Sequence, residues 1–195
     1  MGACAGLLLT GGASRRMGSD KALLEVGGQR LADRAAAALA AVAEPVLEVG
    51  PGRSALRCVR EDPPGSGPLA AVAAGAAALR AGGHDGPVIV LAVDMPFVTV
   101  ELLRLLADRP GPATAVPWAG GHPQVLCARY GPEALAGVER LRAAGGVSLK
   151  RLVEAMDANG EVGWIQPEEW RAVAGPEALA DVDTPGDLRR LLERP

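Results

Sequence analysis

The sequence is poor in aromatic residues and in cysteine, and each shortage excludes a class of protein. Aromatic side chains make up only 3% of the chain, too few for a β-sandwich core or for a surface that stacks nucleic-acid bases. Cys4, Cys58 and Cys127 are odd in number and far apart, so we expect neither a disulfide framework nor a CxxC metal or redox pair. We interpret all three as small, buried apolar residues.

The chain also lacks a long apolar run and an excess of positive charge. No stretch approaches the roughly 18 apolar residues of a membrane span, and the apolar segment around 7–9 is too short for a signal peptide. With 20 basic and 23 acidic residues the net charge is −3, so no basic surface for nucleic acid is expected. These absences predict a soluble, cytoplasmic protein that binds neither nucleic acid nor a membrane.

What the chain does contain is an alternation of strand-like apolar runs and helical stretches rich in Ala and Leu. Its 195 residues, 49% of them hydrophobic, suit one domain with a sizeable core. Strands are predicted at 5–9, 46–49, 88–93 and 124–128, and helices at 31–43, 69–80, 100–107 (capped by Thr99), 132–141, 148–156 and from Thr184 onward. This order predicts a single α/β domain over 1–195, three-layered and Rossmann-like, with a mostly parallel sheet and helices on both faces.

Residues 9–21, LTGGASRRMGSDK, form a glycine-rich loop directly after the first predicted strand. Glycines at this place let backbone N–H groups turn toward a bound anion, and Arg16 and Lys21 would add positive charge over the same phosphates. The spacing excludes both the dinucleotide GxGxxG fingerprint and the GxxxxGK[ST] phosphate loop. A tight connection with solvated arginines is the alternative. The position of the loop, where open α/β sheets bind ligands, and its possession of one of only two lysines favour a phosphate site.

The same loop resembles the signature of the nucleotidyltransferases related to molybdenum cofactor guanylyltransferase (MobA), LxGGxSxRMGxDKxLL, and every fixed position of that pattern is met. The Gly-Gly pair is typical of the guanylyl branch of the family, whereas the cytidylyl branch usually has Ala-Gly. Thr10 stands where the family more often has Ala. The resemblance implies that this loop supplies base and phosphate contacts, with the last two residues on the triphosphate: Leu9, Thr10, Gly11, Gly12, Arg16 and Lys21.

A carboxylate, Asp94, follows the most apolar predicted strand. A charge there is costly unless it is paired or coordinates a cation, although it could instead cap the turn into Met95-Pro96. The resemblance implies that Asp94, as the Asp of a family Asp-x-Pro pattern, holds Mg²⁺ on the nucleotide phosphates, and Mg²⁺ needs only one or two protein carboxylates. Asp183 resembles a late family position and is a candidate second ligand; a cap of the helix at Thr184 is the alternative.

Three further positions are implied by the resemblance. Asp62, before a Gly-Pro-Leu-Ala entry into a helix, matches a family Asp on the guanosine side, and a carboxylate suits either guanine or ribose because it can accept from N–H or hydroxyl donors. His122 and Gln124 match a loop facing the pterin acceptor, while a surface role is the alternative for a lone histidine. The family's Asn contact after the second strand has no counterpart near Val49-Gly50.

These expectations combine into one function. The chain is expected to transfer GMP from GTP to the phosphate of molybdenum-loaded molybdopterin, with a nucleotide-binding part at about 1–110 and an acceptor-binding part at about 111–195. Proteins that insert molybdenum, and molybdoenzymes, are expected as transient partners. A cytidylyltransferase for molybdopterin, a guanylyltransferase for another phosphorylated cofactor, and a nucleotide-binding module without turnover stay open.

Overall fold

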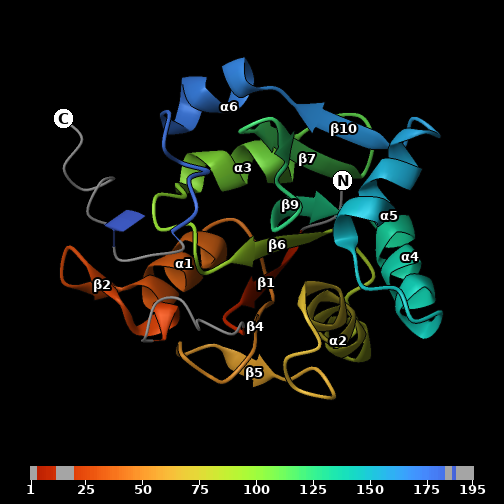
Figure 1. Cartoon of the computed structure of the whole chain (residues 1–195), viewed down its shortest axis with the longest axis horizontal. Helices are drawn as coiled ribbons and strands as arrows, with labels where there is room; N and C mark the ends of the chain where they lie inside the picture. Colours follow the sequence, from red (N-terminus) through yellow and green to blue (C-terminus); the bar gives the residue numbers. More distant parts are fainter. Residues whose placement is uncertain (1–3, 12–19, 183–185, 188–195) are drawn as a thin grey trace.

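The computed structural model describes residues 4–11, 20–182 and 186–187, and its centre is a mixed sheet. The strand order is β10-β7-β9-β6-β1-β4-β5, with β8 paired to β7 (Figure 1). The strands of this sheet are β1 (Ala5–Leu9), β4 (Val46–Val49), β5 (Arg57–Val59), β6 (Val88–Ala92), β7 (Thr114–Ala119), β8 (His122–Pro123), β9 (Cys127–Tyr130) and β10 (Val162–Ile165). A separate hairpin joins β2 (Glu25–Val26) to β3 (Gln29–Arg30).

The sheet is mostly parallel, as predicted. β1 pairs in parallel with β4 and with β6, β4 with β5, and β7 with β10. Only β9 runs against its neighbours β6 and β7, apart from the short β8. β1, β4, β6, β7 and β10 therefore all end at one edge of the sheet, which is where open α/β sheets bind ligands.

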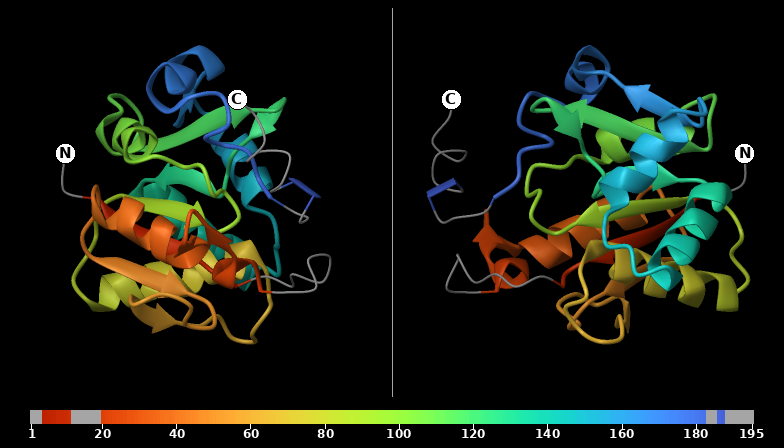
Figure 2. Two further views of the ribbon diagram at one scale, coloured as in Figure 1. Left: turned by 90° about the vertical axis from the view of Figure 1, so that its left-hand side faces the viewer. Right: turned by 45° about the vertical axis from the view of Figure 1, so that its right-hand side comes forward.

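Helices cover both faces of the sheet, which gives the three predicted layers (Figures 1 and 2). Figure 2 (right) shows α4 and α5, in teal and cyan, on the same side as olive α2. One core lies between the sheet and α2, α4 and α5; the other lies between the opposite face and α1, α3 and α6. The described helices are α1 (Leu31–Ala40), α2 (Pro68–Ala81), α3 (Val100–Asp108), α4 (Pro132–Ala143), α5 (Leu149–Asp157), α6 (Pro167–Ala174) and the 3-10 helix η1 (Lys21–Leu23).

Local sequence explains where several helices begin. The Thr99 side chain accepts a hydrogen bond from the Leu102 amide at 3.2 Å and caps α3, as predicted. Ser148 does the same for α5 through the Arg151 amide. Pro occupies the first turn of α2, α4 and α6, where its missing N–H costs nothing.

Arg129 on β9 joins the sheet to the connection between α3 and β7. Its side chain is fully buried and donates to four backbone carbonyls at 2.7–3.0 Å: those of Ala107, Arg109, Pro112 and Ala113. Burial holds the pKa of the guanidinium below its usual value. The arginine thus satisfies main-chain groups that no strand or helix satisfies.

Several predictions about the elements were wrong. The strand predicted at 124–128 begins only at Cys127, because its amide bonds back to the Gln124 carbonyl and closes a turn. The helix predicted at 31–43 ends at Ala40, well before Pro45. Cys58 is exposed on the edge strand β5 rather than buried, whereas Cys4 and Cys127 are buried as expected. The sequence reasoning also missed β5, β7, β10 and α6. The helix predicted from Thr184 lies largely outside the described residues.

In the described part of the chain, no helix combines the length and the apolar character that a membrane crossing needs.

Candidate active site

A pocket of about 380 Å³ lies at the edge where β1 and β6 end. Its wall comes from the end of β1, η1 and its cap Asp20, the loop before α2, the first turn of α2 and the end of β6, together with Leu126. The lining residues are Leu9, Thr10, Gly11, Asp20, Lys21, Glu61, Gly65, Gly67, Pro68, Ala71, Ala92, Val93, Asp94 and Leu126. Five of the residues that the sequence predicted for the nucleotide or metal, Leu9, Thr10, Gly11, Lys21 and Asp94, thus meet in one cavity.

Asp94 and Lys21 face each other across this pocket. Asp94 follows β6 and Lys21 opens η1, and their Oδ2 and Nζ atoms are 4.0 Å apart. The lysine side chain is 14% exposed and the aspartate side chain 31%. The two groups form an ion pair, and from these neighbouring positions the ammonium can contact a bound anion while the carboxylate contacts its cation.

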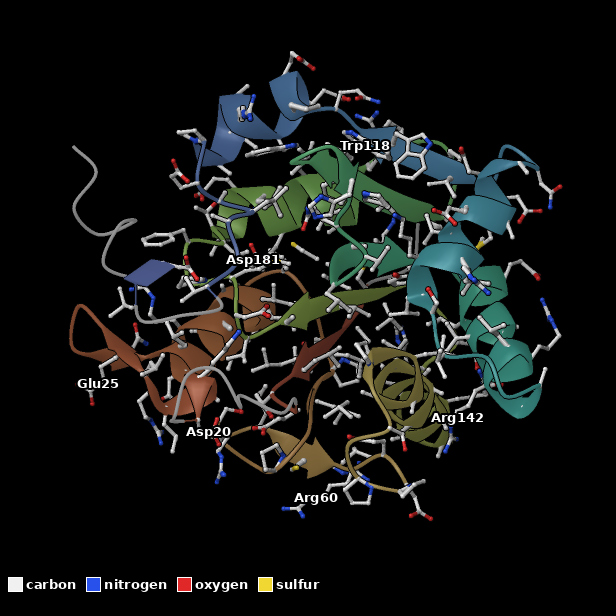
Figure 3. The ribbon with its side chains drawn as sticks, in the orientation of Figure 1. Asp20, Glu25, Arg60, Trp118, Arg142 and Asp181 are labelled. Atoms are coloured by element: carbon white, nitrogen blue, oxygen red, sulfur yellow. The ribbon has the colours of Figure 1, made fainter. Side chains whose placement is uncertain are left out.

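Residues 178–182, near the end of the described chain, contact Asp94 through Val182. The Val182 amide donates to the Asp94 carbonyl at 2.9 Å, and Ala178, Leu179 and Val182 are buried against the second core or beside it. Figure 3 shows Asp181 beside the end of β6, on the same side of the molecule as Asp20. The next residue, Asp183, lies outside the described residues, as do Gly12 and Arg16.

The loop before α2 contributes Glu61 rather than Asp62 to the pocket. The Glu61 side chain is 8% exposed, and its Oε1 accepts a hydrogen bond from the Gly65 amide at 2.9 Å. Asp62 is exposed, and its carbonyl accepts from Arg142. The sequence singled out Asp62 for the nucleotide and not its neighbour Glu61. The one sequence signal for Glu61 was that it stands directly beside Asp62 as a second acidic residue.

Asp20 is a second lining carboxylate that sequence reasoning did not single out. Its Oδ1 accepts from the Ala22 amide at 3.1 Å and caps η1, while its Oδ2 accepts from Arg53 Nε at 2.7 Å. Its place directly before the rare Lys21, inside the family pattern, was a signal for it.

Gly50 explains why no side chain reaches the pocket from the end of β4. Its φ is +150°, and an added Cβ would lie 2.3 Å from Thr10 Oγ1 and 2.6 Å from the Gly11 nitrogen. Only glycine lets β4 and the start of the loop approach this closely. A contact equivalent to the family's Asn is therefore sterically excluded at position 50.

His122 and Gln124 lie together at the β7–β8 hairpin, at the same edge of the sheet, but not among the residues that line the pocket. His122 Nδ1 bonds to the Gly120 carbonyl at 3.1 Å, which requires a proton on Nδ1. Its Nε2 then accepts from Gln124 Nε2 at 3.1 Å, and that amide also donates to the Ala119 carbonyl. Both ring nitrogens are thus engaged within the hairpin.

The tryptophans differ in their burial. Trp170 is buried and donates to the Trp118 carbonyl, whereas Trp118 itself is 36% exposed. Trp118 and Trp164 form an edge-to-face pair with ring centroids 5.4 Å apart. Figure 3 labels Trp118 in the part of the sheet that holds β7 and β10.

The chain is similar to known nucleotidyltransferases in sequence and in fold. The family model described as the MobA-like NTP transferase domain matches residues 6–160. A Pelotomaculum thermopropionicum protein named "Probable molybdenum cofactor guanylyltransferase" is 35% identical over 186 residues, covering 94% of this chain and 89% of its own length. An Opitutus terrae protein of the same name is 39% identical over 183 residues, covering 90% and 86%. The crystal structure of molybdopterin-guanine dinucleotide biosynthesis protein A from Archaeoglobus fulgidus superposes with a TM-score of 0.76 at 25% identity, covering 95% of both chains.

Proposed function

This chain belongs to the MobA-like NTP transferase family, and from that premise we propose that it is a molybdenum cofactor guanylyltransferase. A phosphate oxygen of molybdenum-loaded molybdopterin attacks the α-phosphorus of GTP. The bond from the α-phosphorus to the bridging oxygen of pyrophosphate breaks as the new one forms. The products are the guanine dinucleotide form of the cofactor and pyrophosphate.

The observation that carries this proposal is the single pocket in which the start of the glycine-rich loop, Lys21 and Asp94 meet. Transfer of a nucleotidyl group needs alignment and charge neutralisation rather than a covalent nucleophile. The described residues that line the pocket include no Ser, Cys or His, and the one hydroxyl, on Thr10, donates to Glu48. This lining suits direct transfer between two bound substrates.

Each charged group has a proposed role. Lys21, with Arg16, neutralises the triphosphate, and both favour the transition state, in which negative charge moves toward the leaving pyrophosphate. Asp94 holds Mg²⁺, with Asp183 as the candidate second ligand. The fit rests on donor chemistry, because carboxylate oxygens and phosphate oxygens are what Mg²⁺ prefers, and no described cluster of three His, Cys, Asp or Glu residues offers an alternative. Bound Mg²⁺ supplies neutralising charge and orients the phosphates.

Leu9, Thr10, Gly11 and Gly12 are proposed to contact the base and phosphates, and a carboxylate is proposed to select guanine. Guanine presents two neighbouring N–H donors, on the ring nitrogen N1 and on the 2-amino group, and a carboxylate can accept from both, whereas cytosine presents one amino group beside an acceptor nitrogen. The sequence pointed to Asp62 for this role. Glu61 is the better placed of the two, since it lines the pocket. Its Oε1 also lies close to Gly11 of the glycine-rich loop, 3.7 Å from the position that a Cβ would occupy there.

The acceptor is proposed to bind through the part of the chain from about 111 to 195, with the nucleotide in the part up to about 110. His122 and Gln124 belong to this proposed acceptor side. Since both His122 nitrogens are engaged in the hairpin, the amide oxygen of Gln124 is the more suitable of the two groups to meet a pterin donor. Transient contact with molybdenum-inserting proteins or molybdoenzymes, and a cytoplasmic location, stay predictions.

Pyrophosphate release with each of the four nucleoside triphosphates, with and without molybdopterin, tests the function. We expect release only with GTP, Mg²⁺ and molybdopterin together. Equal or faster release with CTP would overturn the guanylyl assignment and support the cytidylyl alternative. Release with GTP and another phosphorylated cofactor, but not molybdopterin, would overturn the acceptor. Nucleotide binding without release under any condition would indicate a binding module.

A matched pair of variants tests the choice of base. Glu61→Gln keeps an acceptor for the Gly65 amide but turns an N–H toward the base, so we expect the ratio of GTP to CTP affinity to fall at least tenfold, about 1.4 kcal/mol. Asp62→Asn is the control, because its side chain points to solvent. A loss of GTP preference in Asp62→Asn alone would show that the sequence-based choice was right.

A further inference from the structure

Both ends of the glycine-rich loop are bonded to one short segment, residues 48–54, which includes the end of β4 and the turn after it. The loop leaves β1 at Thr10, and Thr10 Oγ1 donates to Glu48 Oε1. It reaches η1 at Asp20, and Asp20 Oδ2 accepts from Arg53 Nε at 2.7 Å. These partners are 38 and 33 residues apart in sequence. Residues 48–54 thus hold the entry and the exit of the loop at the same time.

Glu48 is the centre of this arrangement. It lies on β4 opposite Leu8 of β1, and its exposure is 0%. Besides Thr10, its two carboxylate oxygens accept from the amides of Arg53 and Ser54 at 2.7 and 2.8 Å, and from the Ser54 hydroxyl at 2.7 Å. Burial opposes the charged form, but these hydrogen bonds outweigh it and hold the pKa of the carboxyl below its usual value. A buried carboxylate with this many donors fixes all the groups that donate to it.

Arg53 carries the restraint to the other end of the loop. Its amide is bonded to Glu48, and its guanidinium reaches Asp20, which in turn caps the helix that begins with Lys21. Asp20 also lines the pocket, so its negative charge faces the place where the triphosphate is proposed to bind. The guanidinium of Arg53 offsets that charge as well as fixing the side chain.

We infer that Glu48 and Arg53 are positioning residues for nucleotide binding: together they hold the two ends of the glycine-rich loop so that Thr10 and Lys21 face the same phosphates. We call residues Glu48, Arg53 and Ser54 the loop clamp. The inference rests on the proposed function, because the ligand it concerns is the nucleoside triphosphate. Neither residue is among those that line the pocket, so the clamp acts only through Thr10, Asp20 and Lys21.

Arg53→Met is the primary test, because it removes the guanidinium and keeps the amide that bonds to Glu48. The Arg53 side chain is 36% exposed, so the fold should tolerate the change. The dissociation constants for GTP, CTP and inorganic tripolyphosphate are measured by calorimetry with Mg²⁺, together with Tm. We expect all three constants to rise at least tenfold, with Tm within a few degrees of the wild type and with partial rescue by Arg53→Lys. Arg60→Met is the matched control. It alters an exposed arginine that lies outside the clamp and does not line the pocket. Among described groups its side chain bonds to the Pro51 carbonyl, and Figure 3 shows it pointing outward from the molecule.

Two further variants distinguish a specific effect of the loop clamp on nucleotide binding from a general stabilisation of the fold. Asp20→Asn added to Arg53→Met should bind no worse than Arg53→Met alone, because the two side chains act as one unit. Glu48→Gln must turn an N–H toward either the Arg53 or the Ser54 amide, so it should weaken binding and also lower Tm. Arg53→Met that binds like the wild type, or that adds fully to Asp20→Asn, would overturn the inference. A wild type that binds CTP rather than GTP overturns the guanylyl assignment and leaves the clamp supported if Arg53→Met weakens CTP. A wild type that binds none of the three overturns both.

Discussion

Replacing Asp94 by Asn tests the pocket most directly, because it removes one negative charge at nearly constant volume. The carboxylate sits where β6 ends, 4.0 Å from the Lys21 ammonium. Two roles are open to it: holding Mg²⁺ on the phosphates during transfer, or merely capping the turn into Met95. The two roles predict different sizes of effect on turnover and on stability.

The expected effect on stability is small. Unit charges about 4 Å apart attract by about 4 kcal/mol at an effective dielectric constant of about 20. Desolvation and side-chain ordering offset most of this for partly exposed pairs, which leaves about 1 kcal/mol or less. In a domain of this size, about 1 kcal/mol moves Tm by roughly 2–4 °C. We therefore expect Asp94→Asn to fold and to melt at most about 4 °C below the wild type.

The expected effect on turnover is much larger. If Asp94 holds Mg²⁺ as proposed, the charge that the metal would supply counts most in the transition state. We expect kcat to fall at least about a hundredfold, roughly 2.7 kcal/mol, with a smaller change in the affinity for GTP. A loss of turnover much larger than the loss of stability would identify Asp94 as a group that acts in the transfer and not as a structural cap.

Pyrophosphate release at saturating GTP, Mg²⁺ and molybdopterin, together with thermal melting, is the assay. Asp85→Asn is the control, because Asp85 is an exposed carboxylate before β6 rather than after it. We expect the control to keep both turnover and Tm. Full turnover of Asp94→Asn with a large drop in Tm would refute the reasoning. Asp94 would then be a structural cap, and the metal would have to be sought at Asp183.

Three other predictions concern single residues. Lys21→Ala should weaken GTP binding at least tenfold, about 1.4 kcal/mol, with little change in Tm. Lys150→Ala, on the exposed face of α5, should bind GTP like the wild type. Equal GTP affinities of the two variants would show the glycine-rich loop to be purely structural. Arg129→Met should lower the free energy of unfolding in urea by at least about 3 kcal/mol, because several buried carbonyls lose their hydrogen-bond donor. Arg57→Met, at an exposed arginine, should lower it little. Equal urea midpoints for the two variants would contradict this prediction. Folding lowers the pKa of Glu48, so the charged carboxylate stabilises the fold above its ordinary pKa of 4.5, and this stabilisation is lost as the pH falls through the folded pKa. Glu48→Gln should therefore have a smaller free energy of unfolding than the wild type at pH 7, measured in urea. A difference in free energy that does not narrow in acid would contradict this role of the carboxylate.

The sequence by itself determined the framework and five of the fourteen residues that line the pocket. The first strand and the strand that ends before Asp94 are apolar throughout because both of their faces are buried, and this leaves an unmistakable pattern. Since parallel strands end at the same edge of a sheet, the sequence also indicated that the loop after β1 and the carboxylate after β6 lie at one edge. That β1 and β6 are neighbours in the sheet was decided by the tertiary structure. The glycine and lysine chemistry of the loop then indicated a phosphate ligand.

Short elements at the margins of the sheet were beyond the sequence. β5 and β10 have three and four residues, too few to show a period. β9 begins three residues later than predicted because a turn between Gln124 and Cys127 interrupts an apolar run that looks continuous. Cys58 is exposed because β5 is an edge strand, and strand order is not encoded in local composition.

Tertiary structure alone decided which polar side chains turn inward. Glu61 and Asp62 are neighbours of the same charge, and the path of the loop before α2 buries one and exposes the other. Glu48 gives no sign in sequence of its link to Thr10, because the two are brought together only by the register that sets Leu8 opposite Glu48. Local patterns report the environment of a single strand or helix. The distance between Arg53 and Asp20, or between Lys21 and Asp94, exists only once the layers have packed.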